Sequence, residues 1–128
     1  MNTLKKTLLS LLMATAMAVI STSTFAESDP GRITYKPAEA IDIVAGKIQA
    51  AIEGISKGAS NEEAAALIKP AIDFSKEINA NDKVDNARAK ANRKLKSAMS
   101  HAKESALQEA EQELKDAKKD FEALKSLI

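Results

Sequence analysis

His101 is the single histidine of this 128-residue chain, and Glu104 follows it three positions later. Residues three apart share one face of an α-helix, so an imidazole and a carboxylate at this spacing can approach the same ion. Imidazole nitrogen and carboxylate oxygen are both ligands for divalent copper and zinc. The pair His101 and Glu104 therefore raises the hypothesis of a low-affinity copper or zinc site.

Further carboxylates follow this pair, at Glu109, Glu111, Glu113, Asp116, Asp120 and Glu122. Dinuclear carboxylate bundles, however, take ligands from four helices and include a second histidine. This chain has no second histidine. The sequence therefore favours the alternative, in which an exposed histidine lies beside an exposed glutamate and any metal binding is weak.

Catalytic and cofactor chemistry has little support in the sequence. No Gly-rich turn presents a nucleophile to His101, and no glycine loop of the phosphate-binding type is present. The absence of cysteine excludes covalent haem attachment, disulfides and thiol chemistry. Met99 and His101 are two residues apart, about 200° around a helix, and cannot ligate the same haem iron. We expect a non-enzymatic protein without a cofactor.

The basic residues are concentrated in one segment. Residues 82–104 hold seven of them against three acidic residues: Lys83, Arg88, Lys90, Arg93, Lys94, Lys96 and Lys103. Outside a leader that contains two lysines, the chain has 17 basic and 18 acidic residues, a balance that argues against nucleic-acid binding. We expect these cations mainly to complement neighbouring helices, and the alternative is a face for an acidic partner or anionic lipid headgroups.

Residues 1–26 have the pattern of a signal peptide. Lys5 and Lys6 precede an apolar run over 8–20, and a small residue, Ala26, ends the segment. The apolar run is too short to cross a hydrocarbon core of about 30 Å as a helix. We expect cleavage near Ala26, delivery to the periplasm and no stable membrane insertion afterwards. Residues 27–36 then form an extended N-terminal arm, whose Tyr35 is expected to plug one end of the core.

Two stretches of the chain match when the sequence is shifted by 47 positions. The matched pairs include Lys47 with Lys94, Leu67 with Leu114, and Phe74 with Phe121. A unit of this length is the size of an αα-hairpin. We therefore predict an all-α, up-down four-helix bundle over residues 37–128, made of two repeated αα-hairpins at 37–79 and 82–128.

Local signals place most helix ends. Pro37 suits the first position of a helix, and Gly58 suits the residue that follows one. Ser60 and Glu63 form a capping box that opens the second helix. Asn81 or Asp82 can cap the third.

Apolar residues recur every three or four positions and define the predicted core. Its members are Ile41, Val44, Ile48, Ile52, Ile55, Ala64, Leu67, Ile68, Ala71, Ile72, Ile78, Val84, Ala87, Ala91, Leu95, Ala98, Ala102, Leu107, Ala110, Leu114, Ala117, Phe121, Leu124 and Ile128. Because many are alanine, we expect a thin core of modest stability. Homodimerisation through exposed apolar surface is left open.

The turn between the third and fourth helices is the least marked. Lys103–Ser105 contains neither glycine nor proline, so one continuous helix from Ala98 to Ile128 is the alternative. The repeat places a break opposite Gly58, and Ser105 with Gln108 forms a second capping box. We therefore predict a turn here.

Two resemblances accompany this pattern. Ala110 and Leu114–Lys115, followed by Phe121, are similar to the last helix of the b-type periplasmic cytochromes, which implies their bundle fold without their haem ligands. The segment Ala98–Ser105 resembles the repeats of small His-rich periplasmic metal-binding proteins, although this chain has one histidine. From these features we expect an exported binding or envelope-stress protein that acts on an unknown protein or peptide partner through its helical surface. The alternative is a low-affinity divalent-metal protein.

Overall fold

Four α-helices joined by short turns account for most of residues 34–128, the part of the chain that the computed structural model describes. This part is all-helical, as predicted. Residues 35–128 form one unit, and residues 34–36 precede the first helix without regular structure. The predicted signal peptide and the predicted arm up to residue 33 lie outside the described residues.

Helix α2 (Pro37–Ser56) begins at the predicted proline. The fixed φ of proline suits the first helical position, where its missing N–H costs no hydrogen bond. The helix ends before Gly58, whose φ of 91° lies in the left-handed region that glycine enters without steric cost. Both predicted ends of α2 are therefore confirmed.

Helix α3 (Asn61–Phe74) follows and continues into a short 3₁₀ helix, η1 (Ser75–Glu77). Ser60 Oγ accepts a hydrogen bond of 3.2 Å from the backbone N–H of Glu63, which confirms Ser60 as the N-cap. Pro70 lies inside α3 and is exposed, so its ring faces solvent.

Helix α4 (Asp82–Lys103) begins after Asn81, and α5 (Leu107–Ala123) leads into a second 3₁₀ helix, η2 (Leu124–Leu127). Asn81 Oδ1 accepts a 2.9 Å hydrogen bond from the Val84 N–H, so Asn81, and not the alternative Asp82, is the cap of α4. The Asn81 amide also donates to the Leu127 carbonyl at 2.9 Å. One side chain thus starts α4 and holds the end of η2.

The turn after α4 confirms the predicted break, but the predicted capping box of Ser105 and Gln108 is wrong. The residue before α5 is Ala106, and no side chain caps that helix. Ser105 has a φ of 68°, and its hydroxyl accepts a 2.6 Å hydrogen bond from the Asn61 amide instead. Ser105, with its left-handed backbone, therefore contacts the neighbouring α2–α3 turn and does not cap α5.

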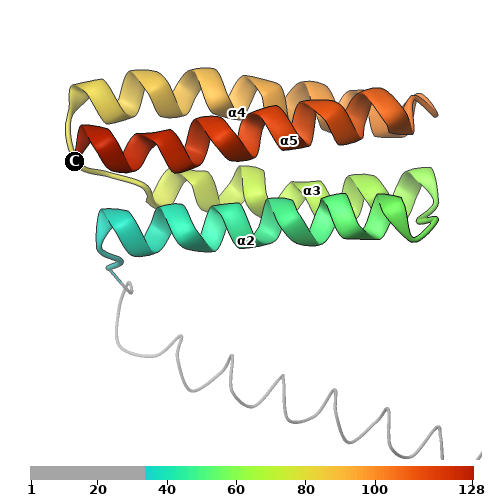
Figure 1. Ribbon diagram of the computed structural model, residues 1–128, viewed down its shortest axis with the longest axis horizontal. Helices are drawn as coiled ribbons and strands as arrows, with labels where there is room; N and C mark the ends of the chain where they lie inside the picture. Colours follow the sequence, from blue (N-terminus) through green and yellow to red (C-terminus); the bar gives the residue numbers. More distant parts are fainter. Residues whose placement is uncertain (1–33) are drawn as a thin grey trace, which may run out of the picture. The chain divides into compact units, whose positions relative to one another are not determined.

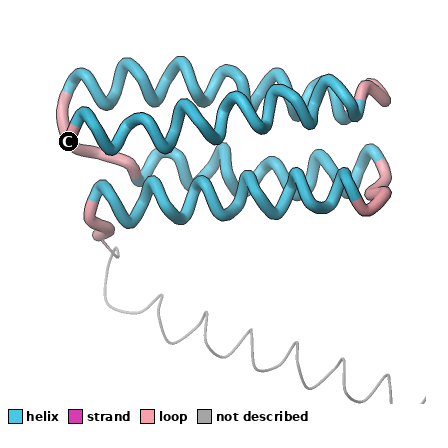
Figure 2. The backbone as a smooth tube through the Cα atoms, viewed as in Figure 1, coloured by secondary structure: helices cyan, strands magenta, loops and turns pink. Residues whose placement is uncertain are grey.

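Figure 1 shows the turns α2–α3 and α4–α5 at one end of the helices and the α3–α4 connection at the other. Helix α2 packs against α3 and α5, and α4 packs against α5 and α3. Loops are confined to the helix ends, as Figure 2 shows. The bond from Asn61 to Ser105 and a 3.2 Å bond from the Ser56 hydroxyl to Glu111 connect the two pairs of helices.

The two turns at one end share their hydrogen bonds at a spacing of 47 residues. In the first turn, the N–H groups of Lys57, Gly58 and Ala59 donate to the carbonyls of Glu53, Ile55 and Gly54. In the second, the N–H groups of Glu104, Ser105 and Ala106 donate to Ser100, Ala102 and His101. Each of these bonds in the second turn is the first-turn bond shifted by 47 positions.

The core between the helices is thin, as predicted. Eleven of the 23 buried apolar residues in the described part are alanine. Its largest fully buried side chains are Phe121, Ile41, Ile48, Ile68, Ile78, Leu95, Leu114 and Leu124. Alanine lets helix axes approach closely but removes little apolar area from water. Tyr35 closes one end by packing edge-on against Phe74, with ring centroids 5.1 Å apart.

The prediction of the core is wrong at two positions, because the exposed fractions of Leu67 and Ile128 are 36% and 50%. The 47-residue shift aligned Leu67 with the fully buried Leu114, but Ile68 is the residue buried to the same extent in α3. A helix turns by about 100° per residue, so a displacement of one position moves a side chain off the core face. The buried positions of α3 therefore match those of α5 when the sequence is shifted by 46 residues, and not by 47.

Candidate functional site

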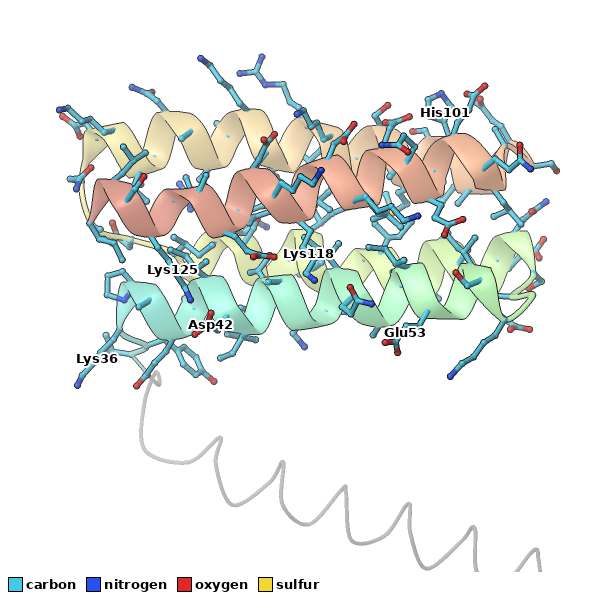
Figure 3. The ribbon with its side chains drawn as sticks, in the orientation of Figure 1. Lys36, Asp42, Glu53, His101, Lys118 and Lys125 are labelled. Atoms are coloured by element: carbon cyan, nitrogen blue, oxygen red, sulfur yellow. The ribbon has the colours of Figure 1, made fainter. Side chains whose placement is uncertain are left out.

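His101 lies in the last turn of α4 and faces α5 (Figure 3). Its Nδ1 atom contacts a carboxylate oxygen of Glu113, and its Nε2 atom lies 3.6 Å from a carboxylate oxygen of Glu109. The Glu113 side chain is mostly covered, whereas that of Glu109 is 70% exposed. When the imidazole is protonated, it therefore forms ion pairs that join α4 to α5.

Glu104 does not form the predicted pair with His101. Helix α4 ends at Lys103, and Glu104 is an exposed residue just beyond it. The acidic side chains that meet His101 come from α5 instead. Within residues 34–128, no group of three or more histidine or carboxylate side chains has a geometry suited to holding a metal ion.

Sequence reasoning missed the partnership with Glu109 and Glu113, although a signal was present. These two residues are four apart, so they share a face of α5. The two helices that flank a short turn run antiparallel, so residues close to the turn on each side approach one another. His101 and Glu109 lie on the two sides of this turn.

The outer surface of α4 is strongly basic. Residues 86–103 contain six cations and no carboxylate. In contrast, α2, α3 and α5 each carry more acidic than basic residues. One helix therefore concentrates the positive charge of the described unit.

Two of the cations on α4 have partners on other elements, and a third, Arg93, donates only to the Ala89 carbonyl of its own helix at 3.4 Å. Arg88 lies 3.6 Å from Asp85 and donates to the carbonyls of Ser75 and Lys76. Lys94 forms a 2.5 Å ion pair with Asp120 of α5. The hydrogen bond to Asp120 raises the pKa of Lys94 above its usual 10.5, partly opposed by desolvation.

The remaining five cations form what we call the α4 basic face. They are exposed, and no carboxylate of the described residues pairs with them: Lys83, Lys90, Arg93, Lys96 and Lys103. On other helices, several lysines have acidic or polar partners. Figure 3 shows two of these, Lys125 close to Asp42 and Lys118 pointing from α5 toward α2. The α4 basic face is thus available to a ligand of opposite charge.

A shallow groove of about 370 Å³ lies beside this face, where α4 meets α5 and η2. Its surface is mainly apolar, and its lining residues are Ala87, Lys90, Asp120, Ala123, Leu124, Ser126 and Leu127. Lys90 belongs both to the groove and to the α4 basic face. No direct signal for this groove is present in the sequence, because its walls come from two separate segments of the chain.

No helix within residues 34–128 combines the length and apolar character needed to cross a membrane. Comparison with known proteins found no matching family model, no similar curated protein and no similar solved structure.

Proposed function

We propose that this chain is an exported, non-enzymatic helical bundle that binds an acidic protein or peptide through the α4 basic face. The observation that carries the proposal is the set of five exposed cations on one helix without carboxylate partners. Like charges held on one face repel one another, and an acidic ligand relieves that repulsion while it gains ion pairs. An envelope-stress role is compatible with such binding.

Architecture and cellular location are part of the same proposal. An up-down bundle derived from two repeated hairpins accounts for the three hydrogen bonds that recur at a spacing of 47 residues. A one-residue deletion after the second turn accounts for the spacing of 46 in the helices that follow. The leader pattern of residues 1–26 supports export to the periplasm, and mass spectrometry of the purified protein tests cleavage near Ala26.

Charge reversal on α4 tests the binding function. The protein purified with its native partners from periplasm is compared with the double variant Arg93→Glu/Lys96→Glu. The control variant Lys36→Glu/Lys119→Glu reverses two exposed lysines outside α4. We expect the α4 variant to lose a partner that the control retains. Raising the salt concentration should release the same partner from the unmodified protein, because salt screens exposed charges. Equal recovery of every partner by both variants would contradict the proposal.

A second candidate function is weak binding of divalent copper or zinc at His101. It is favoured by one observation, the two carboxylates of Glu109 and Glu113 that flank the imidazole. Calorimetric titration with Cu²⁺ or Zn²⁺ should release heat that His101→Ala abolishes. Glu113→Gln removes the carboxylate that contacts His101, and Glu104→Gln removes the one that the sequence predicted as a ligand. Comparing the two variants shows which carboxylate contributes to metal binding. An isotherm unchanged by His101→Ala would exclude the site.

A further inference from the structure

We infer that the groove between α4 and η2 receives an apolar side chain of the acidic partner that binds the α4 basic face. This inference rests on the proposed function and adds a second recognition element to it. The partner would be a peptide segment with one large apolar residue followed by several carboxylates. The groove supplies a concave apolar surface, and the adjoining cations supply the charge.

The walls of the groove suit an apolar group. Ala87 of α4 and Ala123 at the end of α5 are small, while Leu124 and Leu127 of η2 are large. Small residues beside large ones leave a depression that no side chain of the described residues fills. Leu127 is 36% exposed, so a ligand that enters the groove covers apolar surface that now faces water.

The charges around the groove favour a partner with carboxylates. Asp120 is the one acidic residue of the lining, and its charge is already paired with Lys94 at 2.5 Å. Lys90 at the rim has no carboxylate partner within residues 34–128. A ligand seated in the groove therefore meets net positive charge, which continues along α4.

The stretch of the α4 basic face from Lys90 onward sets the size of the partner segment, because Lys83 precedes the groove residues Ala87 and Lys90 on α4. From Lys90 to Lys103 there are thirteen positions, about 20 Å along a helix that rises 1.5 Å per residue. An extended peptide advances about 3.3 Å per residue, so about six residues cover this distance. An apolar residue and seven glutamates are therefore long enough to occupy the groove and the face together.

A peptide fits this surface better than a membrane does. Helices that bind membranes by insertion present an apolar face to the lipid. Within residues 34–128, the large apolar side chains that are exposed are Leu67, Leu127 and Ile128, and none lies on α4. The apolar surface beside α4 is instead a groove at Ala87 and Lys90, from which further cations follow along the helix to Lys103, and this matches a chain with a single anchor.

Two labelled peptides test the inference by fluorescence anisotropy at low salt. One has phenylalanine, glycine and seven glutamates, and the other replaces the phenylalanine with glycine. We expect the phenylalanine peptide to bind about tenfold more tightly, because burying an aromatic side chain is favourable. Ala123→Gln should remove this difference and leave the glycine peptide unaffected. The matched control is Ala66→Gln, the same change at an exposed position of α3.

The outcomes separate the inference from the proposed function. Equal affinity of the two peptides for the unmodified protein, or equal effects of Ala123→Gln and Ala66→Gln, would overturn the anchor groove alone. Binding of neither peptide would overturn the proposed function as well. Capture by phosphatidylglycerol vesicles in place of the peptides would assign the face to lipid. Self-association that Ala123→Gln abolishes would assign the groove to a second copy of the chain.

Discussion

Substitution of neighbouring residues in α3 tests the packing register of the helices. Ile68 is fully buried in the core, whereas Leu67 is 36% exposed. The sequence predicted that both side chains are buried, and the 47-residue alignment pairs Leu67 with the buried Leu114. We therefore compare the variants Ile68→Ala and Leu67→Ala, which remove an aliphatic side chain of equal size from adjacent positions.

The structure gives different magnitudes for the two variants. Truncation of a buried isoleucine or leucine to alanine typically costs 2–5 kcal/mol, because apolar burial is lost and a cavity remains. We expect a cost of about 3 kcal/mol for Ile68→Ala. Leu67 retains much of its exposure to water, so Leu67→Ala should cost about 1 kcal/mol or less. Against a total stability of about 5–15 kcal/mol, this difference is easy to resolve.

The assay is equilibrium unfolding in urea, followed by far-ultraviolet circular dichroism. A common slope against urea concentration is required before the free energies of unfolding are compared. Leu114→Ala serves as the reference for a fully buried leucine in α5. If Leu67→Ala destabilises the protein as much as Leu114→Ala, while Ile68→Ala has a small effect, the register described above is refuted.

Three further predictions follow from single contacts. Asn81→Ala removes both the cap of α4 and the bond to the Leu127 carbonyl, so urea unfolding should show a loss of about 1–2 kcal/mol, and no loss would contradict the capping role. Gly54→Ala places a methyl group 2.4 Å from the end of the flexible, partly exposed Leu67 side chain. Because Leu67 can move, we expect the free energy of unfolding to rise by up to about 1 kcal/mol from helix propensity. A large loss of stability in urea unfolding would show that Leu67 is fixed. Lys94→Met removes an exposed ion pair worth at most about 1 kcal/mol. Because the pKa of Lys94 is raised on folding, this contribution is present below pH 10.5 and is lost as the pH rises through the folded pKa, so unfolding curves of the two proteins should converge in alkali.

Helix ends were predictable because their causes are local. Pro37, Ser60 and Asn81 each act through the backbone of the next turn, and such chemistry can be recognised in a short stretch of sequence. The all-helical class was predictable for a similar reason, since apolar residues recur with the helical period. Ser105 does not cap α5 as the sequence predicts, because its hydroxyl accepts a bond from Asn61, 44 positions away.

The candidate site was less predictable because it depends on which helices are neighbours. The basic character of α4 can be read from the sequence, but the division into paired and unpaired cations cannot. Lys94 has a partner because Asp120 of α5 lies opposite it. The groove likewise requires Ala87 and Leu124 to face one another across two elements. Helical periodicity predicts the face of a residue, whereas these contacts require the relative positions of the helices.

The same division within α4 separates binding from stability. Its inner face contributes Val84, Leu95 and several alanines to the core. Arg88 and Lys94 tie its flanks to η1 and α5. The α4 basic face has no carboxylate contacts within residues 34–128, so reversing Arg93 and Lys96 removes no ion pair of the folded unit. Such a reversal places carboxylates among neighbouring cations and should leave the unfolding free energy within about 0.5 kcal/mol of its original value. Loss of a ligand in that variant therefore reports on recognition, because the fold that presents the face is preserved.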